Sequence, residues 1–544
     1  MSPVVKNSRC IFCSLGCPIE VHLGETSWRT AAPQDGLGLC ARAFLTGDLC
    51  SHPARVNLAA RRIHGKVVTM PVGEAVRSVA EHIAGDGLTG IVVDGNYPNE
   101  AIRAVLTLAA EAPHSIGAVY LPAGDRAMLA GLDAGGWSAG AAPCEENDVV
   151  LVIGDAFATH PPIARAILDA RHAARGNQLL VISPFAGRTA GFATRAAPVP
   201  AGGEAAFLLC LARSLDAAVP GIRSEVECPA AEALAEVLVS ARSPAIVISQ
   251  PDGTTANGHI AALAAACIAQ KLGAPLLPLL TYGNALGAYR TAAECGGVSM
   301  AAVETLAVSG ELRGLVLVGT DLLAATPAVG RRIVDACEFV AVASAFAGAT
   351  FPRADVALPV GLCCEEEGHV TLPTGDTLPI APPAVPVAGA LTLDGLVQSL
   401  REHIPCDAAN RASGPQAARQ PWQLVPEPDG SGMILVASGD VLGFGDGALS
   451  AHSGWARDAR PEPSIAISPA DSKATGLHAG AAATVTTPNG LARLCVEVRD
   501  DLPPHLASVP IDCPETRSLF RWQASPQTAA LCCGPTEVTL GAAD

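Results

Sequence analysis

The chain has few charged residues and no run of basic ones. Asp, Glu, Lys and Arg make up 16% of its 544 residues, and the formal net charge is −17. An acidic chain without a cluster of Lys or Arg repels phosphate backbones, so this composition excludes nucleic acid as an expected ligand. Hydrophobic residues reach 49%, which leaves apolar surface both for cores and for contacts with partner subunits.

The sequence also lacks a segment that would cross a membrane. Its most apolar stretch, residues 260–280, is interrupted by Gln270, Lys271, Gly273 and Pro275, and this pattern predicts a buried helix and strand instead. Residues 1–10 have no apolar core of the signal-peptide kind, so we expect a cytoplasmic protein. No well-placed Gly-x-Gly-x-x-Gly opens a helix, so a nicotinamide-dependent enzyme ranks last among the candidates.

From residue 90 onward, short β-branched runs alternate with Ala-rich helical stretches. The expected strands are 91–93, 149–153, 179–183, 245–249, 315–318 and 339–342. The expected helices between them include 99–110, 162–174, 259–272 and 327–336. Such alternation predicts an α/β protein with doubly wound parallel sheets, which carry helices on both faces.

In sheets of this kind, ligands bind beyond the carboxyl ends of the strands. The loops that follow the expected strands are 94–97, 154–160, 183–189, 250–255 and 319–322. Each of them would serve equally well as an ordinary connection. We expect several of them to converge on one crevice.

The chain divides into four parts. Residues 1–65 would form a small N-terminal domain and residues 66–404 the α/β domains. Residues 405–432, rich in Pro, Ala, Gln and Asp, would form a linker. Residues 433–544 would form a small β-barrel domain, because they contain short strand-like runs separated by Gly and Pro. These runs are 434–437, 464–467, 483–487 and 491–498.

The strongest chemical signal is a group of four cysteines near the N-terminus. Cys10, Cys13 and Cys17 are followed, after 22 intervening residues, by Cys40. Three closely spaced thiolates and a distant fourth are typical ligands of a [4Fe-4S] cluster. Zinc is the main alternative, but structural zinc sites usually present two separated pairs of ligands. We predict that these four cysteines hold one [4Fe-4S] cluster.

The other cysteines carry no comparable pattern. The chain has 18 cysteines in all, and they include the adjacent pairs Cys363-Cys364 and Cys532-Cys533. Adjacent residues do not favour two ligands on one metal. We therefore expect these pairs to be core or reactive thiols.

Further motifs follow the first cysteines in a fixed order. They are Leu39-Cys40-Ala41-Arg42, His52-Pro53-Ala54-Arg55-Val56, Asn147 to Gly154, Leu179 to Ala190, Pro200 to Glu204, Asn284 to Ala288, Ala354 to Pro359, Glu365 to Gly368, and Ser468 to Gly480. In this order they resemble the molybdopterin oxidoreductase superfamily. The resemblance is to formate dehydrogenases, the large iron-sulfur subunit of NADH-quinone oxidoreductase and the B-type subunit of formylmethanofuran dehydrogenase, and it spans nearly the whole chain.

The resemblance implies a fold and a cofactor. The N-terminal part would be a [4Fe-4S] domain, and the barrel would be of the type that binds a molybdopterin dinucleotide. The cofactor would be a bis-molybdopterin guanine dinucleotide that holds molybdenum or tungsten, with Arg42 between the cluster and the pterin. The residues expected to contact the cofactor are Arg42, Gly154, Asp155, Ser183, Pro184, Arg188, Gly319 and Asp321.

The chain departs from these relatives where catalysis would take place. Formate dehydrogenases place a cysteine or selenocysteine before an Arg, but the matching stretch here, Tyr120 to Arg126, contains neither. Asp125 is either an oxygen ligand to the metal or an ordinary N-cap of the following helix. Asp125 and Arg126 are the candidate catalytic residues of this loop.

The expected contacts to the dinucleotide are also altered. Ser183-Pro184-Phe185 stands where the family has Asp-Pro-Arg, and Leu372 and Asp376 stand where it has Asn and Arg. Each lost charge-assisted hydrogen bond would weaken binding by about 1.5–3 kcal/mol. Loss of the pterin is therefore one of the alternatives.

Three functions fit these observations. The first is an enzyme of formate dehydrogenase type, which moves electrons between a small C1 substrate and the cluster. The second is a non-catalytic electron-transfer or scaffold subunit that has lost the pterin, and the third is a subunit like the B-type one of formylmethanofuran dehydrogenase. One cluster cannot form a long electron path. We therefore expect other iron-sulfur or flavin redox subunits as partners in a hetero-oligomeric complex.

Overall fold

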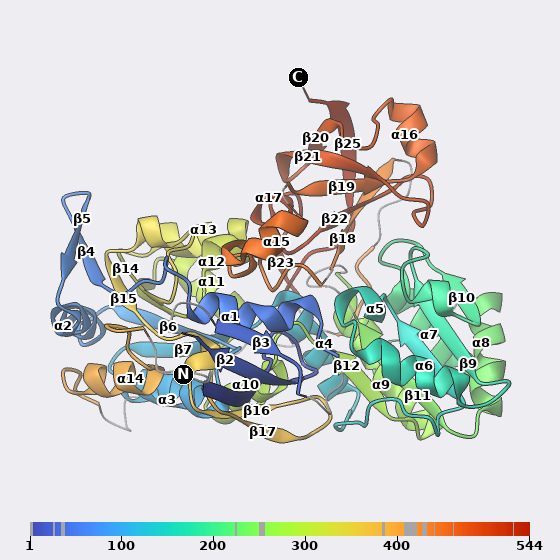
Figure 1. Cartoon of the computed structure of the whole chain (residues 1–544), viewed down its shortest axis with the longest axis horizontal. Helices are drawn as coiled ribbons and strands as arrows, with labels where there is room; N and C mark the ends of the chain where they lie inside the picture. Colours follow the sequence, from blue (N-terminus) through green and yellow to red (C-terminus); the bar gives the residue numbers. More distant parts are fainter. Residues whose placement is uncertain are drawn as a thin grey trace.

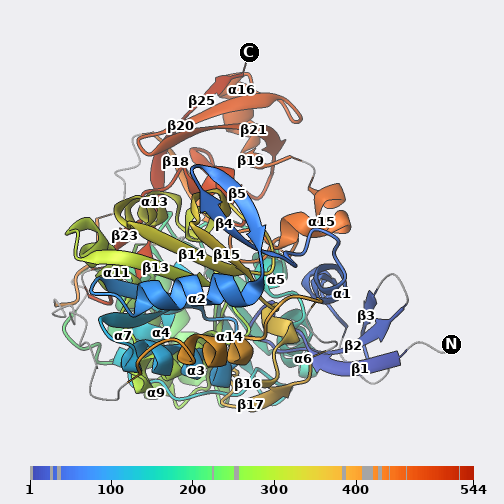
Figure 2. The same ribbon diagram turned by 90° about the vertical axis from the view of Figure 1, so that its left-hand side faces the viewer.

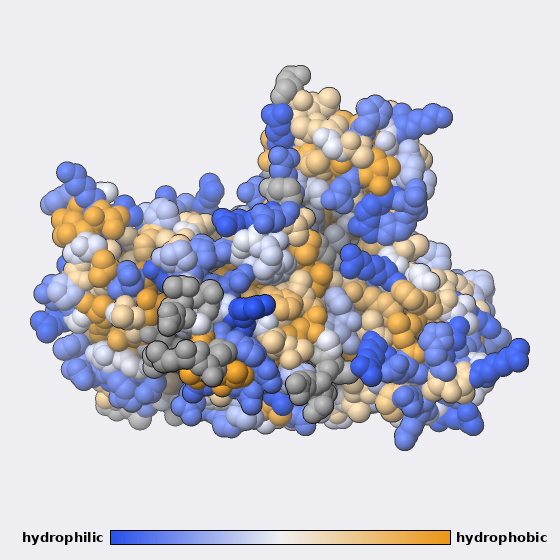
Figure 3. Space-filling view, viewed as in Figure 1, coloured by the Kyte–Doolittle hydropathy of each residue, from blue (hydrophilic) through white to orange (hydrophobic). Residues whose placement is uncertain are grey.

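The computed structural model describes residues 4–24, 28–33, 38–222, 226–249, 256–382, 387–406, 421–426, 432–439, 441–460, 462–525 and 527–543. Two lobes lie side by side, each built on a parallel sheet, and a barrel of C-terminal strands stands above them (Figure 1). Apolar side chains follow the junction of the lobes below the barrel (Figure 3). Among the described residues, no helix is both long and apolar enough to cross a bilayer.

The first lobe is built on a seven-stranded sheet with the order β5-β4-β15-β14-β13-β6-β7. Its strands are β4 (Ala59–Ile63), β5 (Lys66–Met70), β6 (Leu88–Asp94), β7 (Ser115–Tyr120), β13 (Leu312–Val318), β14 (Phe339–Ser344) and β15 (Val356–Pro359). Strand β4, near one edge, is antiparallel to both of its neighbours, β15 and β5, and all other pairs in the sheet are parallel. The sheet therefore joins two stretches of chain that lie far apart in the sequence.

Helices cover the first lobe on both faces. One set consists of α2 (Val72–Ile83), α3 (Asn99–Glu111) and α14 (Leu393–Arg401), which pack against one another on the face turned toward the viewer in Figure 2. A second set contains α11 (Met300–Val308), α12 (Leu322–Ala325) and α13 (Pro327–Ala336). Helix α10 (Ala285–Glu294) and the hairpin of β16 (Gly368–Thr371) and β17 (Thr377–Ile380) pack beside α3.

The second lobe is built on a five-stranded parallel sheet with the order β10-β9-β8-β11-β12. Its strands are β8 (Val149–Ile153), β9 (Gln178–Ser183), β10 (Arg195–Pro198), β11 (Pro244–Ser249) and β12 (Leu276–Leu279). Its helices are α5 (Ala156–Thr159), α6 (Ile163–Ala173), α7 (Glu204–Ser214), α8 (Pro229–Ser240) and α9 (Gly258–Leu272). Helix α4 (Ala123–Ala134), which follows β7 of the first lobe, packs on α9 and so fastens the lobes together.

Strand β8 shows why these strands are continuous apolar runs. Side chains alternate between the two faces of a sheet, and in β8 both faces are covered. Val150 and Val152 pack with the residues of α6, whereas Leu151 and Ile153 belong to the main core. Every residue of the strand is buried, so no position is left for a polar side chain.

Each sheet has a point where the strand order reverses. In the second lobe the chain proceeds from β8 to β10 in one direction and to β11 and β12 in the other. In the first lobe the corresponding reversal lies between β6 and β13. Because ligands of doubly wound sheets bind at such points, we expect ligands at the carboxyl ends of β8, β11, β6 and β13.

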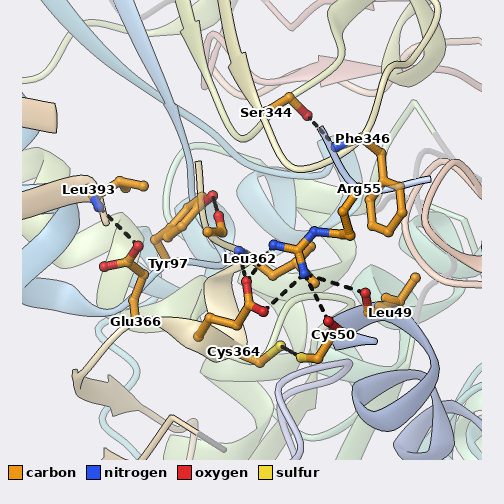
Figure 4. Close-up of polar contacts among 12 residues, drawn as sticks. Leu49, Cys50, Arg55, Tyr97, Ser344, Phe346, Leu362, Cys364, Glu366 and Leu393 are labelled. Atoms are coloured by element: carbon orange, nitrogen blue, oxygen red, sulfur yellow. Dashed lines mark hydrogen bonds and ion pairs between the residues drawn. The ribbon is translucent and has the colours of Figure 1, made fainter. Parts of the chain in front are cut away.

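The N-terminal residues form a small antiparallel sheet, which lies in front of the first lobe in Figure 1, close to its junction with the second. Its strands are β1 (Val4–Arg9), β2 (Pro18–Leu23) and β3 (Trp28–Ala31), and helix α1 (Leu45–Cys50) packs against β3. Beyond α1, Arg55 forms a two-pronged ion pair with Glu365 of the first lobe, at 2.9 and 2.7 Å (Figure 4). Both side chains are almost fully buried, so this pair anchors the N-terminal part.

The C-terminal residues form a closed barrel with the order β18-β22-β19-β21-β20-β25. Its strands are β18 (Met433–Ser438), β19 (Ser464–Ile467), β20 (Ala482–Thr487), β21 (Gly490–Val498), β22 (Leu506–Pro510) and β25 (Thr536–Ala542). Three short helices accompany them, α15 (Gly454–Ala459), α16 (Pro469–Thr475) and α17 (Pro514–Arg517). Closure pairs every strand edge, which is how a small barrel avoids exposed edges.

The α/β class with parallel sheets and the C-terminal barrel are confirmed. Each of the six expected strands and four expected helices of the α/β part is present, within a few residues of its expected ends. The hairpin β4–β5 spans the expected domain boundary at residue 65 and joins the first-lobe sheet. Most of the expected linker 405–432 lies outside the described residues; of the rest, Trp422 packs beside His259.

Candidate functional site

The four predicted cluster ligands come from two short segments. Cys10, Cys13 and Cys17 lie in the connection between β1 and β2, and Cys40 precedes the 3-10 turn Ala41–Phe44. The Cys10 amide donates a hydrogen bond to the Cys17 carbonyl at 2.8 Å, which closes the connection into a loop. Cys10 and Cys13 are buried, whereas Cys17 and Cys40 are partly exposed.

The four thiols influence one another electrostatically. Burial, followed by the neighbouring Cys40 and Cys17, raises the pKa of Cys13 to about 12, and Arg42 opposes this shift. Burial and then Cys40 raise the pKa of Cys17 to about 11. Thiols in such surroundings become thiolates only beside a strong positive charge, which bound iron would supply.

Among the residues that the structure describes, no group of three or more His, Cys, Asp or Glu side chains is arranged to hold a metal ion. The sulfur ligands of a four-iron cubane lie farther apart than those around one zinc ion, where Zn–S bonds of about 2.3 Å set the spacing. The donor set of four thiols fits a cubane in its chemistry. The cluster itself stays a prediction.

Arg42 connects the cysteine site with the C-terminal part of the chain. Its side chain is buried, and its Nε donates to the Gly443 carbonyl at 2.7 Å. Gly443 begins a glycine-rich loop, residues 443–447. Phe444 of this loop packs edge-on against Phe12 of the cysteine loop, with ring centroids 4.9 Å apart. The 443–447 loop therefore lies directly against the cysteine loop.

A second loop, residues 280–284 after β12, holds the cysteine loop in place. The Leu280 amide donates to Ser14 Oγ at 2.8 Å, and the Leu280 carbonyl accepts from the Ser14 amide at 3.1 Å. The Gly283 amide donates to the Ile11 carbonyl at 3.0 Å. A Cβ on Gly283 would lie 2.7 Å from the Ile11 Cα, so only glycine permits this approach.

Asp125 also binds the backbone of the 280–284 loop. Its Oδ1 accepts the Thr281 amide at 2.8 Å and its Oδ2 accepts the Tyr282 amide at 2.9 Å. The N-cap of α4 is Pro122, so the N-cap alternative for Asp125 is wrong. The carboxylate binds the backbone of a different loop because that loop presents two adjacent amides to it. Its role as a metal ligand stays a prediction.

Arg126 points to a different neighbour from Asp125. Its guanidinium lies 5.8 Å from the ring centroid of Tyr289 on α10. Burial lowers the pKa of Arg126, because the charged form loses its hydration. The two candidate catalytic residues are thus adjacent in sequence but belong to separate contact networks.

A buried polar centre lies at the end of β6. Asp94 Oδ2 accepts from the Tyr282 hydroxyl at 2.9 Å, and Oδ1 accepts from the Asn96 amide at 2.9 Å. Asn96 Oδ1 in turn accepts from the Gly283 amide at 2.9 Å. Burial raises the pKa of Asp94 to about 7, although the hydrogen bonds from Asn96 and Tyr282 oppose the shift. This carboxyl therefore exchanges its proton close to neutral pH.

Asp446 of the 443–447 loop lies near this centre. It is partly buried, and its charge contributes to the raised pKa of Asp94. Burial raises the pKa of Asp446 to about 6, against the opposing charge of Arg517. Two carboxyls that titrate near neutrality thus come together from β6 and from the C-terminal part.

A cleft of about 540 Å³ lies between the second lobe and the barrel. It contains five of the residues expected to contact a cofactor, namely Gly154, Asp155, Ser183, Pro184 and Arg188. Ser249 at the end of β11 lines it too, so the cleft sits at the strand-order reversal of the second lobe. The barrel contributes Arg460 and Arg499.

Gly319 and Asp321 lie elsewhere, at the carboxyl end of β13 in the first lobe. The loop 94–97 also belongs to that lobe, whereas 154–160 and 183–189 contribute to the cleft. Two of the expected rim loops thus converge on one crevice, as predicted, whereas 94–97 and 319–322 lie at the separate carboxyl edge of the first-lobe sheet. Loop 250–255 lies outside the described residues.

Several residues of the buried centre carried no signal strong enough to be chosen from the sequence. Asp94 lies in an expected rim loop, but nothing distinguished it from its neighbours. Tyr282 and Asp446 join it only through folding, from the second lobe and from the C-terminal part. A useful signal would have been an acidic residue at the end of an apolar strand beside a strand-order reversal.

Comparison with known proteins shows the fold of the chain. Acetylene hydratase from Pelobacter acetylenicus has a solved structure that matches with a TM-score of 0.74 at 13% sequence identity, over 99% of this chain and 100% of that one. The two chains share one fold. No protein-family profile and no curated protein sequence matches. At 13% identity, this similarity establishes the fold of the chain but not its function.

Proposed function

We propose that the chain is a redox subunit of the molybdopterin oxidoreductase type, with one [4Fe-4S] cluster on Cys10, Cys13, Cys17 and Cys40. The observation that carries the proposal is that these four thiols come together from two segments, so that Cys40 contributes to the raised pKa values of Cys13 and Cys17. The order of the sequence motifs and the shared fold support it. Arg42, two residues after the fourth thiol, connects this site with the C-terminal part through its hydrogen bond to the Gly443 carbonyl.

The cleft between the second lobe and the barrel would hold the dinucleotide end of a pterin cofactor. Its volume suits a nucleotide-sized ligand. Arg188 is exposed at its edge, and Arg499 faces it while paired with Asp501. Both would neutralise phosphate charge. When bound, the molybdenum or tungsten of such a cofactor supplies the oxidation and reduction of the substrate, which in a formate dehydrogenase type enzyme is a small C1 compound.

A second candidate is an electron-transfer or scaffold subunit without the pterin. Two observations favour it. Both oxygens of Asp125 already accept backbone amides, and Phe444 fills the space between the cysteine loop and Tyr282. In either case the electrons would pass through the one cluster to other iron-sulfur or flavin subunits. A third candidate is a role like that of the B-type subunit of formylmethanofuran dehydrogenase.

Metal and pterin analysis of anaerobically purified protein tests both candidates. We expect about four irons per chain, as one cubane requires. Stoichiometric molybdenum or tungsten with pterin would support the enzyme, and iron without pterin would support the second candidate. The variant Cys13→Ser should lose the iron, whereas Cys532→Ser, which changes a buried cysteine of the C-terminal part, should keep it. Zinc in place of iron, or iron unaffected by Cys13→Ser, would contradict the cluster.

A further inference from the structure

The carboxyl edge of the first-lobe sheet is closed by side chains of the chain itself. Tyr97 packs so closely on Gly319 that a Cβ there would overlap its ring. Tyr282 stacks on Phe444 with ring centroids 5.4 Å apart and an interplanar angle of 23°. Asp94 accepts a hydrogen bond from the Tyr282 hydroxyl and is buried. An acidic group is thus enclosed at the strand-order reversal, where doubly wound sheets place their chemistry.

The groups that face Asp94 come from four elements. Tyr282 belongs to the 280–284 loop, Asp446 to the 443–447 loop, Cys363 to the turn Cys363–Glu365, and Tyr97 to the chain that follows β6. All four are neutral or acidic. The charge of Arg517 lowers the pKa of Asp446, and the charge of Asp321 raises it.

Two contact paths lead from Asp94 to the cysteine loop. One is a chain of hydrogen bonds, from Asp94 to the Asn96 amide and from the Asn96 side chain to the Gly283 amide. That amide also reaches the carbonyl of Ile11, the residue directly after Cys10. The other path is aromatic and runs from Tyr282 through Phe444 to Phe12. These contacts connect Asp94 to the cysteine loop through buried groups, where charges interact more strongly than in water.

We propose that Asp94, buried and hydrogen-bonded to Tyr282, is the group that takes up a proton when the cluster on the N-terminal cysteines is reduced. This inference rests on the proposed function, because it requires the cluster. A low-potential one-electron donor supplies the electron, and the cluster gains one negative charge. One proton from solvent forms an O–H bond with the Asp94 carboxylate, so charge and atoms balance and no cluster bond breaks.

The sign of the effect follows from electrostatics. An added negative charge on the cluster stabilises the protonated form of Asp94, so its pKa is higher in the reduced protein than in the oxidised protein. Between these two pKa values, one proton accompanies each electron. The midpoint potential of the cluster should then fall by about 59 mV per pH unit, the value for a tenfold change in a one-electron equilibrium. The fall should begin at the pKa of Asp94 in the oxidised protein, which burial raises above the usual range of a carboxyl group.

The experiment is a redox titration of the iron-loaded full chain from pH 5.5 to pH 9, followed by the electron paramagnetic resonance signal of the reduced cluster. Asp94→Asn should make the potential independent of pH in this range. The matched control is Glu366→Gln. Glu366 is also buried, its pKa is also raised to about 7 by burial, and it binds the Leu393 amide on the side away from Arg55 (Figure 4). Its loss should leave the slope unchanged.

Two milder variants should move the onset of the slope in opposite directions. The Tyr282 hydroxyl stabilises the Asp94 carboxylate, so Tyr282→Phe should raise the pKa and move the onset to higher pH. The Asp446 charge raises the pKa of Asp94, so Asp446→Asn should move the onset to lower pH. This pair decides the question even where Asp94→Asn does not fold.

The outcomes separate the inference from the proposed function. A wild-type chain that binds no iron would overturn the proposed function, and the inference with it. A chain with its full complement of iron but a potential that does not vary with pH would overturn the inference alone. So would a slope that survives Asp94→Asn, or one that disappears in Glu366→Gln.

Discussion

Arg55 and Glu365 show how much a single buried contact contributes at the residue scale. The side chains are 2% and 0% exposed, and Glu365 also accepts the Leu362 amide at 2.8 Å. Taking a charge out of water costs several kcal/mol, which only a partner with good geometry offsets. The two parallel hydrogen bonds of this pair provide that geometry.

Glu365→Gln should therefore destabilise the chain strongly, because it leaves the Arg55 guanidinium buried beside a neutral amide. Removing one partner of a buried pair costs about 3–5 kcal/mol, whereas exposed pairs contribute about 0–1 kcal/mol. The control is Glu294→Gln, whose partner Arg103 is half exposed. Calorimetry of the two variants should show a much larger fall in the unfolding temperature for Glu365→Gln. Equal falls would contradict the anchoring role of the pair.

At the scale of elements, the turn after β8 and the turn after β13 share one design. Asp155 caps α5 and accepts the amide and the hydroxyl of Thr189, at 2.9 and 2.7 Å. Asp321 caps α12 and accepts the same two groups of Thr350. These carboxylates were expected to contact a cofactor, but each already joins two loops at the carboxyl edge of its sheet. Their hydrogen bonds explain why an acidic residue stands there.

Gly187→Ala should disrupt the first of these turns. A methyl group at Gly187 would overlap Asp155 Oδ2, so the carboxylate or the loop after β9 must move. Overpacking of this kind costs about 1–3 kcal/mol. Gly191→Ala in the same loop meets no atom within 4 Å and serves as the control. Thermal unfolding should separate the two variants; a neutral Gly187→Ala would show that Asp155 is not fixed by this turn.

The strands of the α/β part are predictable from sequence for a physical reason. β8 and β9 are covered on both faces, so almost all their residues are apolar and the run is obvious. β1 is mostly exposed and contains Lys6, Asn7 and Ser8, so its pattern does not predict a strand. It forms because β2 pairs with it along its whole length.

The candidate site likewise has one part that could be predicted from the sequence and one part that could not. The cysteine spacing is a local pattern, and its four residues could be chosen before the fold was known. The buried centre depends on residues that meet only in the folded chain, since Asp94 comes from β6, Tyr282 from the second lobe and Asp446 from beyond β18. A pKa raised by burial is a property of that packing, so no local pattern reports it.

At the scale of the whole molecule, the cleft depends on two units that are distant in sequence. The second lobe provides Arg188, the barrel provides Arg499, and a ligand that bridges them would stabilise their association. Binding to the folded state alone stabilises it by about 2.7 kcal/mol at a ligand concentration 100 times Kd. Guanosine 5′-diphosphate is a suitable probe, because it carries the base and phosphates that the proposed cofactor would place there.

We expect guanosine 5′-diphosphate to raise the unfolding temperature of the wild-type chain, and added salt to weaken the effect. Arg188→Gln and Arg499→Gln should each weaken binding by about 1.5–3 kcal/mol, at least tenfold in Kd, since each removes a charge-assisted hydrogen bond. Arg165→Gln, on the exposed face of α6, should bind like the wild type. Isothermal titration calorimetry measures all four proteins. Equal affinities would show that Arg188 and Arg499 do not bind the phosphates. The cluster proposal does not depend on this result.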